Sequence, residues 1–310
     1  VEGFYAITGD GKTAVIEMAA ASGLHHIPRK QRNPLLTTTR GTGELILDAL
    51  DHGVDRIVLG LGGSATNDGG TGMATALGIT FFDENEVELV MQGGVLSRIA
   101  RIDFSGVDPR VKQIRFEAAC DVTNPLVGPQ GASVIFGPQK GATPEMVTVL
   151  DQGLNHLGDV VKASLNLDIK DIPGAGAAGG LGAGVIAFLN GCLKAGIETI
   201  LNIVHFNDCI EDADLVITGE GRIDGQTVHG KAPIGVAKRA KIYGIPVISL
   251  AGGLGEGYQS VYDHGIDAVF SIVNGISTLD DALLNGKRNV EQTSINIAKT
   301  ICLKKILQKV

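Results

Sequence analysis

A glycine-rich segment directly after a short apolar run is the feature that most constrains how this chain folds. Residues 56–72 read RIVLGLGGSATNDGGTG, which predicts a buried strand at 57–59 and then a loop of glycine and small polar side chains. The sequence favours a helix from Met73 onward. Backbone N–H groups at a helix N-terminus bind anions, and glycines let a ligand approach the backbone closely. The segment therefore predicts an anion-binding loop within an α/β fold.

The composition limits the class of protein. The chain has 310 residues, which predicts two domains because single hydrophobic cores usually stop growing near this size. Glycine accounts for 44 residues, but 44% of the chain is hydrophobic and no Gly-X-Y period is present, which excludes collagen and disorder. A net charge of −8 argues against a nucleic acid or an anionic membrane as partner. We therefore expect any phosphate to be bound by a local group of residues.

The cysteines give no sign of a disulfide framework or a metal site. Their spacing shows neither a Cys-x-x-Cys pair nor a zinc pattern, which predicts reduced thiols in the core of a cytoplasmic protein. The four positions are Cys120, Cys192, Cys209 and Cys302.

Two segments resemble well-known patterns that we do not favour. Residues 172–193 carry no charge and are long enough to cross a bilayer, but they contain seven glycines, so we expect a glycine-rich loop and a buried helix at 181–189. The run Gly11-Lys12-Thr13 is one residue short of a P-loop, because Ala6 stands where the motif requires glycine. Strand-forming residues on both sides of Asp10-Gly11 favour a β-hairpin instead.

The order of the predicted elements indicates α/β architecture. A helix is expected at 43–50 before the glycine-rich loop, and strands at 78–82 and 114–119 after it. Apolar runs at 215–218, 246–250 and 268–273 alternate with predicted helices at 233–243 and 258–264, which is a βαβαβ pattern with a parallel sheet. We place the domain boundary near His205, giving domains 1–205 and 206–310.

Four loops combine small residues with a helix start and are candidates for phosphate chemistry: 60–72, 137–141, 173–184 and 219–231. Transfer of a phosphoryl group needs cations for its oxygens and carboxylates to hold Mg²⁺. Lys140 supplies a cation in the second loop, although an ordinary solvated lysine fits the same pattern. The last loop carries charges of both signs, among which Asp224-Gly225 is also a common turn pair. The residues after strand 114–119 include Asp121 and Asn124, which suit either a ligand hydroxyl or a turn.

Dinucleotide binding is the main alternative for the first loop. Residues 60–65 read GLGGSA and fit G-x-G-x-x-[G/A], with Asp83 near the expected distance beyond, so an NAD-dependent oxidoreductase is a second hypothesis. In that fingerprint the helix begins inside the motif. The following TNDGGTG would break its first turns, because each glycine costs about 0.5 to 1 kcal/mol relative to alanine in a helix. A longer loop is therefore favoured.

Five motifs in order resemble the bacterial glycerate kinase family of the first class. They are GGSATNDGG from Gly62, ACDVTNPLVGPQGAS from Ala119, FGPQKGAT from Phe136, GAGAAGGLGAG from Gly174 and TGEGRIDGQTVHGKAP from Thr218. The resemblance covers essentially the whole chain. It implies two unlike α/β domains with the site in the cleft between them, one of them Rossmann-like with a parallel sheet. It also implies an N-terminal segment with an Asp-Ser-Phe-Lys-Gly-Ser motif, which does not occur in this sequence, so we expect the Rossmann-like sheet to lack its first strands here.

The same resemblance implies a reaction and its participants. It implies an ATP- and Mg²⁺-dependent kinase that phosphorylates D-glycerate, with 2-phosphoglycerate as the favoured product, in the cytoplasm and compatible with a homo-oligomer. A non-catalytic nucleotide-binding module remains a further hypothesis. The roles implied are catalysis for Asp68, Lys140 and Arg222, substrate or phosphate binding for Gly62, Gly63, Ser64, Thr66, Asn67, Asp121, Asn124 and Lys231, and Mg²⁺ binding for Glu220 and Asp224. Asp68 is the first choice for orienting or deprotonating the attacking hydroxyl.

Overall fold

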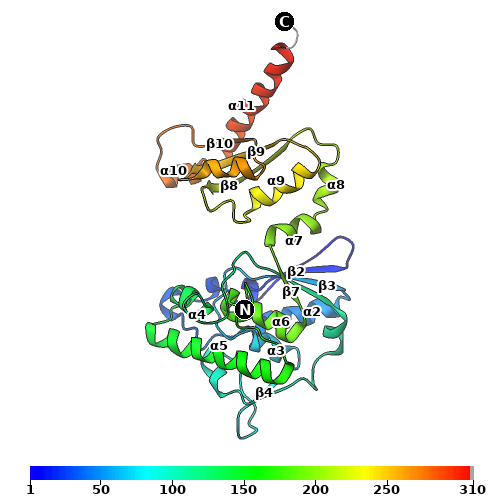
Figure 1. Ribbon diagram of the computed structural model, residues 1–310, viewed down its shortest axis with the longest axis vertical. Coiled ribbons are helices and arrows are strands. Elements are labelled where there is room, and N and C mark those ends of the chain that lie inside the picture. The colour runs from blue at the N-terminus through cyan, green and yellow to red at the C-terminus, as the bar shows by residue number, and fades with distance from the viewer. Residues whose placement is uncertain (308–310) are drawn as a thin grey trace. The chain divides into compact units, whose positions relative to one another are not determined.

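A computed structural model describes residues 1–307 and divides the chain into two compact units (Figure 1). Unit 1 is Val1–Thr199 and unit 2 is Ile200–Val310. The division falls inside helix α7 (Gly196–Ile203). The boundary predicted near His205 lies a few residues further along the chain, at the start of helix α8 (Phe206–Ile210).

Unit 1 is built on a five-stranded sheet with the order β1-β2-β3-β6-β7. The first two strands pair antiparallel and the others pair parallel, so the predicted hairpin at Asp10-Gly11 is confirmed. Gly11 has a φ of 73° in the turn, which glycine adopts at little cost. The strands of unit 1 are β1 (Ala6–Ile7), β2 (Thr13–Glu17), β3 (Arg56–Gly60), β4 (Thr80–Phe82), β5 (Arg101–Asp103), β6 (Arg115–Ala119) and β7 (Cys192–Lys194), with β4 and β5 forming a separate antiparallel pair.

Helices cover the five-stranded sheet of unit 1 because the apolar side chains on one face of each helix pack against the apolar side chains of the strands. Ile57 and Leu59 of β3 are buried in one core with Ile46 of α2, Met73 of α3 and Leu181 of α6. The helix predicted at 43–50 is confirmed as α2, with an earlier start, and the predicted helix at 181–189 is the second part of α6. The helices of unit 1 are α1 (Ala19–Ser22), α2 (Arg40–Asp51), α3 (Thr71–Ala76), α4 (Ala132–Phe136), α5 (Pro144–Leu165) and α6 (Ala177–Leu189), with short 3₁₀ helices η1 (Leu24–His26), η2 (Arg29–Gln31), η3 (Gly93–Arg98), η4 (Pro109–Gln113) and η5 (Pro138–Lys140).

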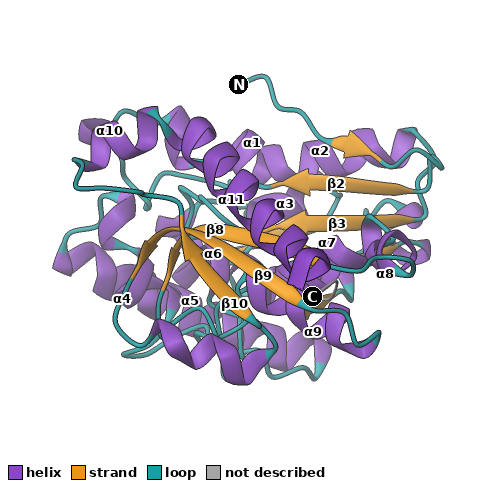
Figure 2. Cartoon of the chain, turned by 90° about the horizontal axis from the view of Figure 1, so that it is seen from above, coloured by secondary structure: helices purple, strands orange, loops and turns teal. Residues whose placement is uncertain are grey.

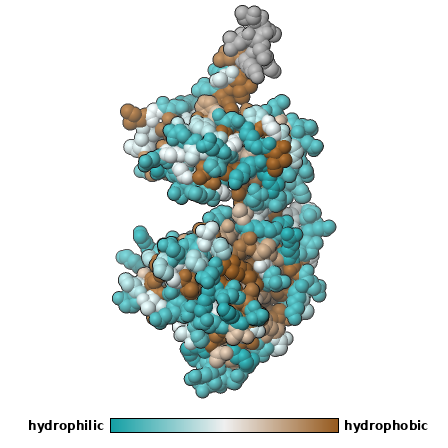
Figure 3. All heavy atoms as spheres, in the orientation of Figure 1, coloured by the Kyte–Doolittle hydropathy of each residue, from teal (hydrophilic) through white to brown (hydrophobic). Residues whose placement is uncertain are grey.

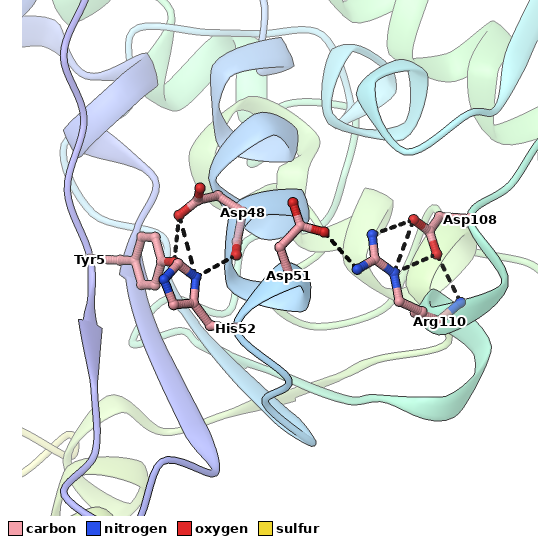
Figure 4. Close-up of polar contacts among 6 residues, drawn as sticks. All are labelled: Tyr5, Asp48, Asp51, His52, Asp108 and Arg110. Carbon is pink, nitrogen blue, oxygen red and sulfur yellow. Dashed lines mark hydrogen bonds and ion pairs between the residues drawn. The ribbon is translucent and has the colours of Figure 1, made fainter.

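Polar contacts hold the last turns of α2 to the segments on either side (Figure 4). Tyr5 donates a hydrogen bond of 2.6 Å to Asp48, and burial together with this carboxylate raises the pKa of Tyr5 to about 12. Arg110 bridges Asp51 and Asp108, with N–O distances of 2.7 Å to each. Exposed pairs of this kind contribute about 0 to 1 kcal/mol each, so they position α2 more than they stabilise the unit.

Helix α6 begins with a kink that brings its backbone against the glycine-rich loop. Residues 178–180 are left-handed, and the amide of Gly69 donates to the carbonyl of Gly179 at 3.0 Å. A Cβ added to Gly179 would lie 2.0 Å from the carbonyl oxygen of Thr66. Glycine is therefore required here both by the positive φ and by the approach of the two backbones.

Unit 2 contains a three-stranded sheet in which all neighbours are parallel, as the βαβαβ pattern predicts (Figure 2). Val216, Val247 and Ile234 lie in its core. The segment 258–264 is a 3₁₀ helix rather than an α-helix. The elements are β8 (Val216–Ile223), β9 (Val247–Leu254), β10 (Ala268–Ser271), α9 (Ala232–Ile242), η6 (Tyr258–His264), α10 (Leu279–Leu284) and α11 (Gly286–Leu307).

The prediction of a loop at 219–231 is partly wrong, because strand β8 continues to Ile223. Glu220 pairs with Ala251 and Arg222 with Gly253, so the ladder with β9 runs through the glycine-rich sequence. Glycine and charge made this stretch read as a loop. The neighbouring strand nevertheless satisfies its backbone hydrogen bonds, and Glu220 and Arg222 are therefore strand residues.

Apolar side chains of α10 remain exposed on unit 2 (Figure 3). Leu279 and Leu283 are 74% and 70% exposed and rim a hollow of about 550 Å³ against the sheet. This face of the sheet is less completely covered than the apolar face in unit 1. None of the helices in residues 1–307 is long and apolar enough to cross a membrane.

The expectation that the cysteines lie in the core is wrong. Cys192, Cys209 and Cys302 are exposed and Cys120 is partly buried, and all four are free thiols.

We expect Gly179→Ala to destabilise unit 1 much more than Gly53→Ala. Both residues have a positive φ, 70° and 75°, but a Cβ at Gly53 would meet no atom within 4 Å. The control therefore measures the conformational cost alone, about 1 to 2 kcal/mol, whereas Gly179→Ala adds a clash with backbone and is expected to cost about 3 kcal/mol or more. Urea unfolding followed by circular dichroism measures both. Equal losses of unfolding free energy in the two variants would show that the backbone around Gly179 has room for a Cβ.

Candidate active site

Unit 1 contains a cavity of about 230 Å³ where β3 and β6 end. Ligands in parallel sheets bind at such carboxyl edges. Three of the predicted loops meet here, and they meet with the segment that contains Asp121. The lining residues are Leu61, Gly62, Gly63, Ser64, Ala119, Cys120, Asp121, Val122, Phe136, Gln139, Lys140, Ala177 and Ala178.

The glycine-rich loop presents backbone to this cavity. A Cβ at Gly62 would meet no atom within 4 Å, and Gly63 has a φ of 72°. Ser64 completes this part of the lining and is itself almost fully buried. The predicted binding residues Gly62, Gly63 and Ser64 are therefore brought to one site.

The next two predicted binding residues, Thr66 and Asn67, do not line the cavity. Thr66 and Asn67 are buried, and in the described part of the chain Thr66 Oγ1 and Asn67 Oδ1 have no hydrogen-bond partner. Asn67 Nδ2 donates to Ser133 Oγ at 3.0 Å. Sequence reasoning missed Ser133, since a lone serine carries no signal beyond its place in the ACDVTNPLVGPQGAS motif.

Asp68 is fully buried, and both of its carboxylate oxygens are occupied. Oδ2 accepts hydrogen bonds from the backbone N–H and the hydroxyl of Thr39, at 2.7 and 2.8 Å, and from the N–H of Gly72, while Oδ1 accepts from Gly70. Burial raises the pKa of Asp68, and these hydrogen bonds act in the opposite direction. The carboxylate thus ties the start of α3 to the start of α2 and does not line the cavity.

Lys140 is buried, so the interpretation of a solvated lysine is wrong. Its side chain lines the cavity with 1% of the residue exposed, and Nζ donates to the carbonyl of Thr66 at 2.7 Å. Burial lowers the pKa of Lys140 to about 7, and the charge of Asp68 acts in the opposite direction. The amine is therefore both a structural donor and a titratable group inside the site.

Asp121 and Asn124 differ although they are close in sequence. Asp121 lines the cavity, and its Oδ1 accepts a hydrogen bond of 2.8 Å from the N–H of Gly196. Asn124 Nδ2 donates to the carbonyl of Gln130 at 2.8 Å, which is a local turn contact. The structure thus brings Asp121 to the cavity and gives Asn124 a place in a turn.

The charged residues of unit 2 form a second group at the end of β8. Thr227 Oγ1 donates to Glu220 at 2.7 Å and accepts from the N–H of Asp224 at 3.1 Å. Asp224 also pairs with Arg222 and Lys231, at 3.3 and 3.7 Å. Sequence reasoning missed the buried Thr227, which links the carboxylate of Glu220 to the backbone of Asp224. Among residues 1–307 no cluster of three or more His, Cys, Asp and Glu side chains is arranged to hold a metal.

These features define an α/β protein with a small cavity at the carboxyl edge of its parallel strands. The chain belongs to the glycerate kinase family, which it matches over residues 1–302. A glycerate kinase of Halalkalibacterium halodurans is 56% identical over 96% of this chain and 78% of its own length. The glycerate 2-kinase of Escherichia coli is 54% identical over 98% of this chain and 80% of its own. A crystal structure described provisionally as glycerate kinase 2, from Salmonella typhimurium LT2, superposes with a TM-score of 0.87 at 51% identity over the whole chain and 80% of that chain.

The dinucleotide hypothesis finds no support in the fold. Helix α3 begins at Thr71, well after the GLGGSA segment at 60–65, so no helix starts inside the motif. Asp83 pairs with Arg98 near the β4–β5 hairpin rather than facing the cavity. Together with the family match, this removes the basis for an NAD-dependent oxidoreductase.

We expect replacement of Lys140 by methionine to stabilise the protein more at pH 6 than at pH 9. The pKa of this lysine is about 7 in the folded state and 10.5 for an ordinary lysine, so the folded state binds fewer protons between these values. The cost of burying the charge is present in full below about pH 7 and decreases as the pH rises toward the ordinary value. Methionine removes that cost.

Urea unfolding of both proteins across this pH range measures the difference. Lys112→Met, at an exposed lysine of the same unit, is the control and should leave the pH dependence unchanged. A benefit of Lys140→Met that is independent of pH would contradict the lowered pKa.

Proposed function

We propose that this chain is a glycerate kinase that transfers the γ-phosphoryl group of ATP to the 2-hydroxyl of D-glycerate. The observation that carries the proposal is the cavity itself, because Gly62 to Ser64, Lys140 and Asp121 line one small space in a member of the glycerate kinase family. The name of the Escherichia coli relative, glycerate 2-kinase, supports the choice of hydroxyl. The four free thiols suit the reducing cytoplasm.

The size of the cavity favours the acceptor over the nucleotide. Its volume of about 230 Å³ is below the range of about 300 to 1,000 Å³ typical of sites for larger ligands. A three-carbon hydroxy acid fits such a space. We infer that the N–H groups of the glycine-rich loop bind its carboxylate, that Lys140 balances its charge, and that Asp121 contacts the hydroxyl.

Asp121 suits the attacking hydroxyl better than Asp68 does. Of the two carboxylates only Asp121 lines the cavity, and a general base must reach the proton that it accepts. Asp68 has four hydrogen bonds to its two oxygens. Its catalytic role stays a prediction, and the contacts favour a positioning role in which it fixes the loop and lies near the Lys140 charge.

We assign ATP and Mg²⁺ to unit 2, which we propose is a Rossmann-like unit. Thr227 contacts the carboxylate of Glu220 and the backbone N–H of Asp224, and the two carboxylates are oxygen ligands that suit Mg²⁺, which protein sites bind through one or two carboxylates plus substrate phosphates. When bound, Mg²⁺ neutralises charge on the phosphates. Arg222 and Lys231, which pair with Asp224 here, would turn to the phosphate oxygens as Asp224 engages the metal.

Release of ADP that depends on D-glycerate tests the proposal in the intact protein. We expect turnover with ATP and D-glycerate and, by NMR of the product, phosphate on the 2-position. Binding of ATP without turnover would indicate a non-catalytic module and contradict the proposal. Phosphate on the 3-position would overturn the choice of hydroxyl only.

In the same assay, Asp121→Asn is expected to lower kcat by about 10²-fold or more, because general bases contribute about 10²- to 10⁴-fold. Its unfolding midpoint should not change, since the carboxylate is exposed enough to lose its charge without a buried penalty. Asp171→Asn, at an exposed carboxylate of unit 1, is the control and should retain full activity. Wild-type kcat in Asp121→Asn would remove this residue from the mechanism.

A further inference from the structure

Gly196 holds the carboxylate of Asp121 at the mouth of the cavity. The two residues follow the neighbouring parallel strands β7 and β6, whose register pairs Ala119 with Lys194. The strand ends therefore bring them together, and the N–H of Gly196 donates to Asp121 Oδ1 at 2.8 Å. Gly196 is also the first residue of α7, and the N-terminus of a helix favours a negative charge.

The absence of a side chain at Gly196 matters for this contact and for little else. The three nearest atoms to an added Cβ would all belong to Asp121, with Oδ2 at 2.9 Å and Oδ1 at 3.1 Å. The φ of Gly196 is outside the left-handed range, so the backbone does not require glycine. Alanine is also the better helix former by about 1 kcal/mol. The nearest group that an alanine side chain at position 196 would meet is therefore the carboxylate of Asp121.

The second oxygen of Asp121 is left for a ligand. In the described part of the chain the only hydrogen bond to this carboxylate is the one from Gly196, to Oδ1. Oδ2 therefore has its lone pairs available while Oδ1 is fixed. A single N–H on one oxygen sets the rotation of the carboxylate and so the direction in which the other oxygen accepts a hydrogen bond.

We propose that Gly196 is a positioning residue for phosphoryl transfer, which fixes Asp121 through its N–H and its missing Cβ so that Oδ2 accepts the hydroxyl of the small hydroxy acid. This inference rests on the proposed role of Asp121. The N-terminus of α7 would thus orient the Asp121 carboxylate, which contacts the hydroxyl of the acceptor. Misplacement of a contacting group by about 1 Å is enough to cost 10²-fold in rate.

Two substitutions test the two parts of the contact in the intact enzyme. Gly196→Ala adds the obstructing Cβ alone, and Gly196→Pro adds the same Cβ and also removes the N–H donor, at a first helical position where proline is tolerated. Each is expected to lower kcat/KM for D-glycerate tenfold or more and to leave KM for ATP within about twofold of the wild type. The unfolding midpoint should stay the same or rise for Gly196→Ala. If one variant fails to fold, the other still provides the test.

The control is Gly9→Ala, because Gly9 also has an ordinary φ and an added Cβ there would meet no atom within 4 Å. It should behave as the wild type. The decisive comparison adds Gly196→Ala to Asp121→Asn. If Gly196 acts through Asp121, the double variant has the kcat/KM of Asp121→Asn alone.

Three results would overturn the inference. They are a wild-type kcat/KM in both Gly196 variants, a loss that adds in full to that of Asp121→Asn, and an equal rise of KM for ATP. Failure of the proposed function is a separate result, since it would appear as a wild-type protein without D-glycerate-dependent ADP release or as a fully active Asp121→Asn.

Discussion

The hydrogen bond from the buried amine of Lys140 to the carbonyl of Thr66 is the interaction on which the site depends. An amine without a partner in the interior costs several kcal/mol, so the lysine is tolerated because this carbonyl accepts a hydrogen bond from it and because the Asp68 charge lies nearby. The bond joins the segment around η5 to the glycine-rich loop, which are far apart in the sequence. It thereby sets one wall of the cavity against another, and its donor is the same group that balances the charge of a bound anion.

The unusual glycine content has a physical purpose in unit 1. The loop that contains Thr66 packs closely against other stretches of backbone, since a Cβ at Gly179 would meet Thr66 and one at Gly184 would meet Gly69. Such close contacts hold the N–H groups of Gly62 and Gly63 in place while leaving them uncovered. Rigid and exposed backbone donors are what an anion site needs, because they stabilise charge without having to reorganise.

The sequence allowed the architecture to be predicted where local patterns suffice. Alternating apolar runs with Pro233 at a helix start and Gly244 after its end predicted the parallel sheet of unit 2, and the Asp10-Gly11 pair predicted the hairpin. The same local reasoning failed at β8, where glycine and charge resemble a loop but a neighbouring strand provides the hydrogen bonds.

Three of the four predicted loops line one cavity, whereas the roles predicted for individual residues stay predictions. The motifs identified Asp68, Lys140 and Asp121, yet the surroundings of each depend on partners far along the chain. Thr39 donates two hydrogen bonds to one oxygen of Asp68, and Gly196 donates one to Asp121. Ser133 and Thr227 gave no signal, because a hydroxyl acquires a role only from what the fold places beside it. Short-range sequence patterns therefore locate the candidate site residues, whereas the contacts that distinguish their roles are seen only in the structure.

The most direct test of this account is a crystal structure of the intact protein with D-glycerate. The account predicts the glycerate carboxylate against the N–H groups of Gly62 and Gly63 with the amine of Lys140 beside it, and the 2-hydroxyl within hydrogen-bond distance of Asp121. Density for D-glycerate at another position, with this cavity holding only water, would contradict it.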